Sequence, residues 1–177
     1  RNTVALMFRI ASVLLFLLIW TTQLRSQDCV PPLIPEEHKW KSASAYKKET
    51  ESIKRALRWL CCSPIQSEIA LRSQANAYVL EWLSGTPTVR LNIETKHLTF
   101  IEEYPELLFT FIHGAMLFCL EQPKQNELSL VYLNGYEAVI RLAKFDKDVW
   151  RSETIKHLRR LKKKKELQAY IEALISE

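Results

Sequence analysis

The residue best placed to do chemistry is His113, because it lies inside an apolar run over residues 107–120. A neutral imidazole can act as a general base or as a ligand near neutral pH. A histidine on an apolar helix is, however, more often a core residue whose ring is hydrogen-bonded to a neighbour. We therefore expect His113 to form a buried polar site in the core. An enzyme centred on His113 remains a third hypothesis for the function.

The densest charge in the chain follows residue 158. Six cations fall within seven residues: Arg159, Arg160, Lys162, Lys163, Lys164 and Lys165. Such a cluster attracts an anionic lipid surface or an acidic partner, and each charge adds about 1 kcal/mol near a membrane. No aromatic residue interrupts the run for base stacking, so nucleic acid is not an expected partner. The alternative is a solvated helix end, where cations are favoured by the helix dipole.

Motifs for other chemistry are missing from the sequence. The histidines show no HExxH or HxxxH spacing, and no GxSxG, Walker or GxGxxG motif occurs. The chain has only three glycines, which leaves little for a phosphate-binding loop. We therefore predict a non-enzymatic protein, with no catalytic, cofactor-binding or metal-binding residues.

The four cysteines are Cys29, Cys61, Cys62 and Cys119, and they show no CxxC or Cys/His spacing typical of a metal site. If residues 61 and 62 lie on a helix, their side chains point about 100° apart, so only one can face the core. Two states remain open. The thiols are buried and free, or Cys29 is bridged to Cys61 or Cys62, which an exported protein would allow.

Residues 1–26 have the composition of an export signal. Arg1 and Arg9 precede an uninterrupted apolar run at residues 10–20, and a polar stretch follows. As a helix this run covers about 17 Å, well short of the ~30 Å core of a bilayer, so a cleaved signal peptide is the first interpretation. Counted over residues 4–20, with Arg9 reaching the interface, the run could be an uncleaved membrane anchor. A buried core helix is the third interpretation.

The remaining chain predicts one helical domain after a spacer. Several prolines make residues 27–41 a non-helical spacer, and residues 42–177 form the domain. Apolar residues at helical spacing predict helices over about 42–61, 64–84, 106–120 and 127–144, a fifth capped by Asp146, and a sixth after residue 165. Ser63 should cap the second helix, and Gly85 should end it with a positive φ.

The helix over 106–120 is apolar on all sides and too short to span a bilayer, so it should be the central buried helix. Gly114 within it predicts a close approach of another helix. Val89, Leu91 and Ile93 alternate with polar residues, so residues 88–101 should form a small β-hairpin or an extended loop. The predicted fold is thus all-α: a compact bundle of five to six helices around the 106–120 helix.

These features predict an exported protein of the periplasm or cell envelope, or a secreted one. The leading hypothesis is a protein-interaction or structural module whose protein partner the sequence does not name. The alternative is a membrane-tethered domain, anchored through residues 4–20, that docks on an anionic surface through residues 159–165.

Overall fold

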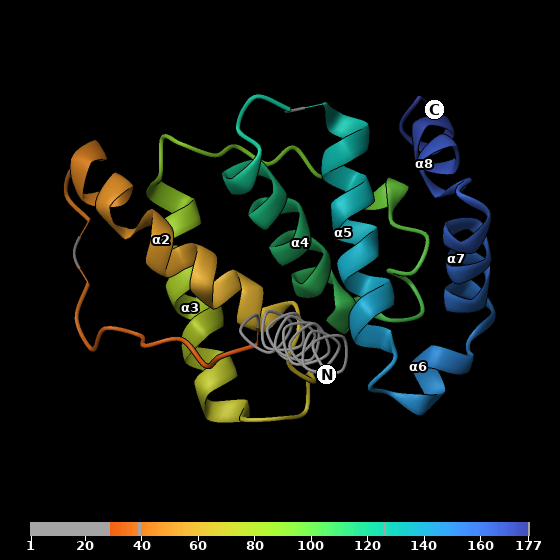
Figure 1. Ribbon diagram of the computed structural model, residues 1–177, viewed down its shortest axis with the longest axis horizontal. Coiled ribbons are helices and arrows are strands. Elements are labelled where there is room, and N and C mark those ends of the chain that lie inside the picture. Colours follow the sequence, from red (N-terminus) through yellow and green to blue (C-terminus); the bar gives the residue numbers. More distant parts are fainter. Residues whose placement is uncertain (1–28, 39, 126, 177) are drawn as a thin grey trace, which may run out of the picture. The chain divides into compact units, whose positions relative to one another are not determined.

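The computed structural model describes residues 29–38, 40–125 and 127–176, so the predicted export segment lies outside the described residues. Within these ranges the chain forms seven α-helices and two short 3-10 helices, and no strand (Figure 1). The prediction of an all-α fold is confirmed. No helix in the described ranges is both long enough and apolar enough to cross a membrane.

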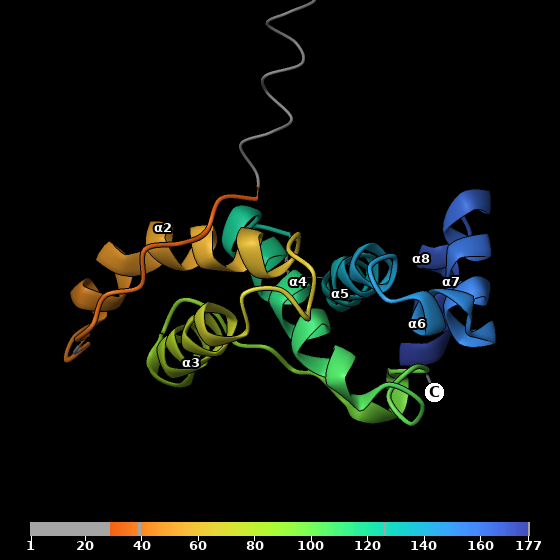
Figure 2. The ribbon, with the colours of Figure 1, turned by 90° about the horizontal axis from the view of Figure 1, so that it is seen from below.

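The helices pack in a row from one side of the domain to the other (Figures 1 and 2). Helix α2 contacts α3 and α4, α4 contacts α5, and α5 contacts α7 and α8, while α6 links α5 to α7. The bounds are α2 Ala43–Leu60, α3 Ile69–Gly85, α4 Leu108–Glu121, α5 Leu128–Ala143, α6 Lys147–Arg151, α7 Glu153–Lys164 and α8 Leu167–Ile175, with 3-10 helices at Thr95–His97 and Pro105–Leu107.

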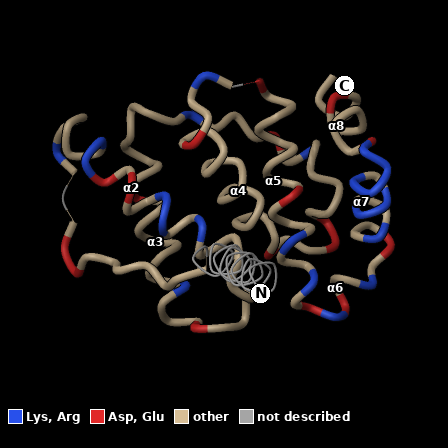
Figure 3. The backbone as a smooth tube through the Cα atoms, in the orientation of Figure 1, with Lys and Arg blue, Asp and Glu red and all other residues tan. Residues whose placement is uncertain are grey.

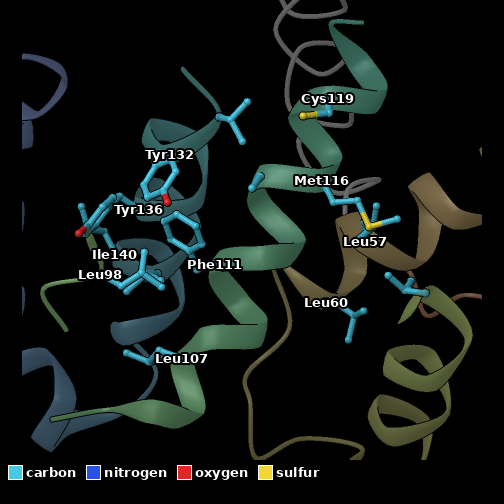
Figure 4. Close-up of a cluster of buried hydrophobic side chains, with 14 of the residues drawn as sticks. Leu57, Leu60, Leu98, Leu107, Phe111, Met116, Cys119, Tyr132, Tyr136 and Ile140 are labelled. Carbon is cyan, nitrogen blue, oxygen red and sulfur yellow. The ribbon is translucent and has the colours of Figure 1, made fainter. Parts of the chain in front are cut away.

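The centre of the domain is the α4–α5 pair, which glycines allow to pack closely. A Cβ atom added at Gly114 would lie 2.5 Å from the Cβ of Ala138, so the expected close helix approach is present. A Cβ at Gly135 would lie 2.6 Å from the Phe111 ring. In Figure 4 the labelled Phe111 of α4 lies beside Tyr132 and Tyr136 of α5. Because these contacts leave no spare volume, a larger side chain at either glycine would force the helices apart.

The start of α3 differs from the prediction. The helix begins at Ile69 rather than near residue 64, after a turn in which the Ser67 amide donates to the Pro64 carbonyl at 3.1 Å. Ser63 does not cap the helix, because its hydroxyl and carbonyl oxygens accept from the guanidinium of Arg72, at 2.5 and 2.6 Å. An expected capping side chain is therefore used by a tertiary contact instead.

Two further expectations about helix ends are wrong. Gly85 is the last residue of α3 and has no positive φ. It is needed for space, since a Cβ there would overlap the hydroxyl of Tyr46. The expected fifth helix is two helices, because Ser152 has an extended backbone and its hydroxyl accepts from the Ile155 amide at 3.2 Å, which starts α7. Asp146 caps α6, as predicted.

Two segments without regular structure are also ordered on the helices. Over residues 88–101 the structure has an extended loop with one 3-10 turn, which is the second of the two predicted alternatives. Along the predicted spacer, the Trp40 ring lies 5.5 Å from the rings of Tyr46 and Tyr78, and His38 pairs with Glu81 at 2.8 Å. This part of the predicted spacer thus rests on α2 and α3.

Candidate interaction surfaces

Helix α7 brings most of the predicted cations onto one surface, seen as blue stretches in Figure 3. Its apolar residues Ile155 and Leu158 are buried, which turns the basic side of the helix outward. An open groove on this surface, called here the α7 groove, is lined by Ile140 of α5 and by five cations of α7. These are Lys156, Arg159, Arg160, Lys162 and Lys163. The predicted cations Lys164 and Lys165 are exposed but do not line the groove.

Three of the five cations in the α7 groove are held by neighbouring groups. The Arg159 guanidinium lies 3.3 Å from the centre of the Trp150 ring and also donates to the Trp150 carbonyl. The other two form ion pairs, Lys162 with Glu137 at 3.0 Å and Lys156 with Glu153 at 2.7 Å. These neighbours orient all three side chains, and the two carboxylates also neutralise part of the charge of Lys156 and Lys162.

Arg159, Arg160 and Lys163 form no ion pair with any described residue, and of these Arg160 and Lys163 also have no stacked ring. These two lie three residues apart on α7, so their side chains are neighbours on the helix surface. The groove therefore offers two available charges above the apolar side chain of Ile140. Such an arrangement can bind the anionic headgroup of a lipid through the two charges and an apolar part of the same lipid through Ile140.

His113 is buried as predicted, with a relative exposure of 1%. The expected hydrogen bond is absent, because neither ring nitrogen has a hydrogen-bond partner among the described residues. Burial, with a smaller contribution from the charge of Arg72, lowers the pKa of His113 to about 3. The imidazole ring is thus neutral at physiological pH. The ring of Phe109 stacks on it, with the two ring centres 6.4 Å apart. A reaction at His113 would need a path from solvent, and neither the α7 groove nor the cleft described below contains this ring.

Arg72 is a buried polar residue that the sequence analysis did not single out. Its guanidinium donates to the carbonyl oxygens of Leu60 and Ser63 and to the Ser63 hydroxyl, and it lies 5.4 Å from the Trp59 ring. These contacts join the end of α2 to the start of α3. A signal was present, because residue 72 continues the apolar side of α3 formed by Ala75, Val79 and Trp82.

A second surface lies beside the extended loop. A cleft of about 380 Å³, called here the 87–92 cleft, is lined by residues 87–92 on one side and by the end of α4 and start of α5 on the other. The helical side consists of Cys119, Pro123, Leu128 and Val131. Leu128 is 39% exposed there. The alternating pattern predicted the extended backbone, but only the packing of α4 and α5 creates the cleft.

The cysteines fall into two classes. Cys29 and Cys62 are disulfide-bonded, whereas Cys61 and Cys119 carry free thiols. Of the two partners left open for Cys29, it is therefore Cys62 that is oxidised. Burial raises the pKa of the Cys61 thiol to about 12 and also raises that of Cys119. No group of His, Cys, Asp and Glu in the described ranges is arranged to hold a metal ion.

Comparisons with known proteins identify no family for the chain. No family model matches it, and no curated protein or solved structure matches it significantly. The two surfaces and the buried polar groups are consequently the features on which a function can be based.

Proposed function

We propose that the protein is an exported, envelope-associated helical domain that acts through contacts with other polypeptides rather than through catalysis. Two observations support export. The apolar run at residues 10–20 has the features of an export signal, and Cys29 and Cys62 are disulfide-bonded. Structural disulfides persist in oxidising compartments such as the periplasm or the extracellular space. Buried free thiols at Cys61 and Cys119 are compatible with either environment.

The observation that carries the interaction function is the extended loop beside the 87–92 cleft. Among the described residues, the main-chain N–H and C=O groups of residues 89–93 form no hydrogen bond. An extended backbone with unpaired groups is a template for another extended chain, which would supply the missing hydrogen bonds. The adjacent cleft leaves room for such a chain, and the exposed Leu128 offers it an apolar contact.

Site-specific photo-crosslinking in an exporting host tests this function. A photoreactive residue at Asn92, which is exposed and lines the cleft, should give crosslinked products of higher mass. The matched control is Lys47, which is also exposed but lies on α2. Products from both positions, or from neither, would contradict a polypeptide-binding surface at the cleft.

Export is tested on the same purified protein. Its N-terminus should lie near Gln27 if the segment is a signal peptide, whereas an intact chain in the membrane fraction would indicate an anchor. Without reductant, alkylation of the denatured protein should modify Cys61 and Cys119 only. An intact chain with four reactive thiols in the cytosol would contradict export.

The α7 groove favours a second candidate function, docking on an anionic membrane surface. Arg160 and Lys163 are its available charges, and each contributes about 1 kcal/mol near such a surface. The double variant Arg160→Gln/Lys163→Gln should therefore lose most binding to vesicles with anionic lipid at low salt. Lys47→Gln/Lys48→Gln removes the same charge from an exposed part of α2 and should bind as the parent does. Equal sedimentation of the parent with anionic and neutral vesicles would exclude this candidate.

A further inference from the structure

Residues 89–94 of the extended loop have the burial pattern of a β-strand but no neighbouring strand among the described residues. Val89 is buried and Leu91 and Ile93 are half-buried, whereas Arg90, Asn92 and Glu94 are exposed. This alternation is the pattern of a strand that rests one face on a core. Glu94 has extended backbone angles, φ −101° and ψ 124°, and its N–H donates to the Tyr132 hydroxyl at 2.7 Å, which fixes this end of the loop on α5.

We propose that residues 90–94 pair in antiparallel fashion with the same residues of a second copy of this chain, about a two-fold axis at Asn92. The inference rests on the proposed interaction function and names its partner. A pair centred on Asn92 places Arg90 opposite Glu94 of the other copy and Leu91 opposite its Ile93. Residues directly opposite each other in an antiparallel pair lie on the same face. The exposed residues therefore meet each other, and so do the half-buried ones.

Symmetry makes every favourable contact occur twice. Two Arg90–Glu94 pairs of opposite charge form on the exposed face, and two Leu91–Ile93 pairs form on the face that rests on the helices. The Arg90 side chain has no ion pair with any described residue in the single copy. Glu94 lies 3.6 Å from Lys96 and 3.9 Å from His97, so it keeps a cationic neighbour as well.

Other registers are less favourable. A centre at Ile93 would place Arg90 opposite Lys96, a like-charge pair, and a centre at Leu91 would place Arg90 opposite Asn92. A register shifted by half a step would bring half-buried residues opposite exposed ones. Among the registers that keep the faces matched, the one centred on Asn92 pairs Arg90 with an opposite charge. The charges of the loop thus select the second copy in a single arrangement.

The main-chain groups of Leu91 and Ile93 provide the remaining attraction. Leu91 and Ile93 of the two copies can exchange main-chain hydrogen bonds across the axis, and these groups form none within the described chain, so pairing breaks no bond. Arg90 and Glu94 then form the non-hydrogen-bonded pairs, and the main-chain groups of Glu94 keep their bonds to Tyr132 and His97. The 87–92 cleft provides room alongside this backbone. A contact of this size is small compared with a permanent dimer interface, so association should be reversible and dependent on concentration.

The test is sedimentation equilibrium of the protein as isolated from an exporting host, over a range of concentrations. The parent should form a dimer. Arg90→Glu and Glu94→Arg should each weaken it about tenfold, because each creates two like-charge pairs. An equimolar mixture of the two variants should dimerise like the parent, since every pair across the axis is again of opposite charge. Lys47→Glu is the matched control for a charge reversal elsewhere and should dimerise normally. Restored association in the mixture also shows that both variants are folded.

A parent that stays monomeric throughout, or a dimer that resists both single reversals, would overturn the self-pairing. The photo-crosslink at Asn92 separates this failure from failure of the proposed function. A product that contains two copies of this chain supports self-pairing. A product with a different protein overturns self-pairing but supports the interaction function, and no product overturns both.

Discussion

Two buried polar side chains, Arg72 and His113, have opposite surroundings. Arg72 is 8% exposed, and its two terminal nitrogens donate to three oxygen atoms of Leu60 and Ser63, although its Nε has no partner among the described residues. His113 is 1% exposed and neither of its ring nitrogens has a partner among the described residues. A buried polar group without partners costs stability, whereas one that satisfies several acceptors holds the structure together. The difference teaches that burial of a polar residue alone does not tell whether it supports the fold.

The largest expected effect is the loss of Arg72. In Arg72→Met the carbonyl oxygens of Leu60 and Ser63 lose their donor in the interior, and the free energy of unfolding should fall by about 3 kcal/mol. Arg72→Lys keeps one charged donor and should cost less. Urea unfolding followed by circular dichroism measures both. If Arg72→Met is as stable as the parent, the contacts of Arg72 are not structural and the contrast with His113 disappears.

The next effect concerns the size of His113 rather than its polarity. His113→Ala removes a packed ring and should lower the free energy of unfolding by about 2 kcal/mol. His113→Leu fills most of the space and removes two unpartnered nitrogens, so it should match or exceed the stability of the parent. The same unfolding measurements apply. An equal loss in both variants would mean that the ring nitrogens make favourable interactions in solution.

The pH dependence of stability gives a smaller effect with a defined sign. The pKa of His113 is about 3 in the folded protein against an ordinary value of 6.5, so below pH 6.5 the unfolded chain takes up a proton that the folded chain does not. Stability therefore falls as the pH decreases from 6.5 towards 3. Between pH 7.5 and 5.5 this histidine should remove about 1.4 kcal/mol. The loss of unfolding free energy over this interval should be smaller by that amount in His113→Leu than in the parent. Identical pH profiles for the two proteins would show that the His113 ring is accessible to protons.

The smallest effect tests why the pKa of His113 is low. The Phe109 ring stacks on the imidazole and is itself 45% exposed, so it covers His113 from solvent. Phe109→Ala should cost about 1 kcal/mol of stability and should also reduce the pH dependence, because water can then hydrate the charged imidazole. NMR titration of the ring would detect the higher pKa. An unchanged pKa would show that residues other than Phe109 exclude water from His113.

Helices were predictable from the sequence where their own residues determine them. The apolar spacing of residues 128–143 and the cap at Asp146 act within a few residues, and both appear as expected. The start of α3 was not predictable, because the Ser63 oxygens are used by Arg72, nine residues away. The break at Ser152 escaped for a different reason. Trp150 and Leu161 would lie only about 20° apart around one continuous helix, so this pair of apolar residues shows no interruption. The buried residues Val149 and Leu158 would lie about 180° apart, and their spacing was the sign of the break.

The candidate surfaces show the same limit. The basic run could be found by counting charges, and its amphipathic helix followed from Ile155 and Leu158. The ion pair of Lys162 with Glu137 of α5 could not be found from the sequence, because it depends on how two helices pack. The 87–92 cleft arises likewise between segments that are distant in sequence. Local patterns thus predicted which residues are extended or charged, and packing decided which of their groups remain available.

The adjacent residues Cys61 and Cys62 are close enough for thiol–disulfide exchange between them. A thiolate next to a disulfide would normally attack it and scramble the pairing. With the Cys61 pKa at about 12, only about one molecule in 100,000 carries that thiolate at pH 7, so the folded protein is protected from rearrangement by its own packing. The unfolded chain has no such protection, and there Cys29 can react with either neighbour. The end of α2 must therefore form before the oxidation of Cys62 is secure, which makes correct oxidation a consequence of folding rather than its cause.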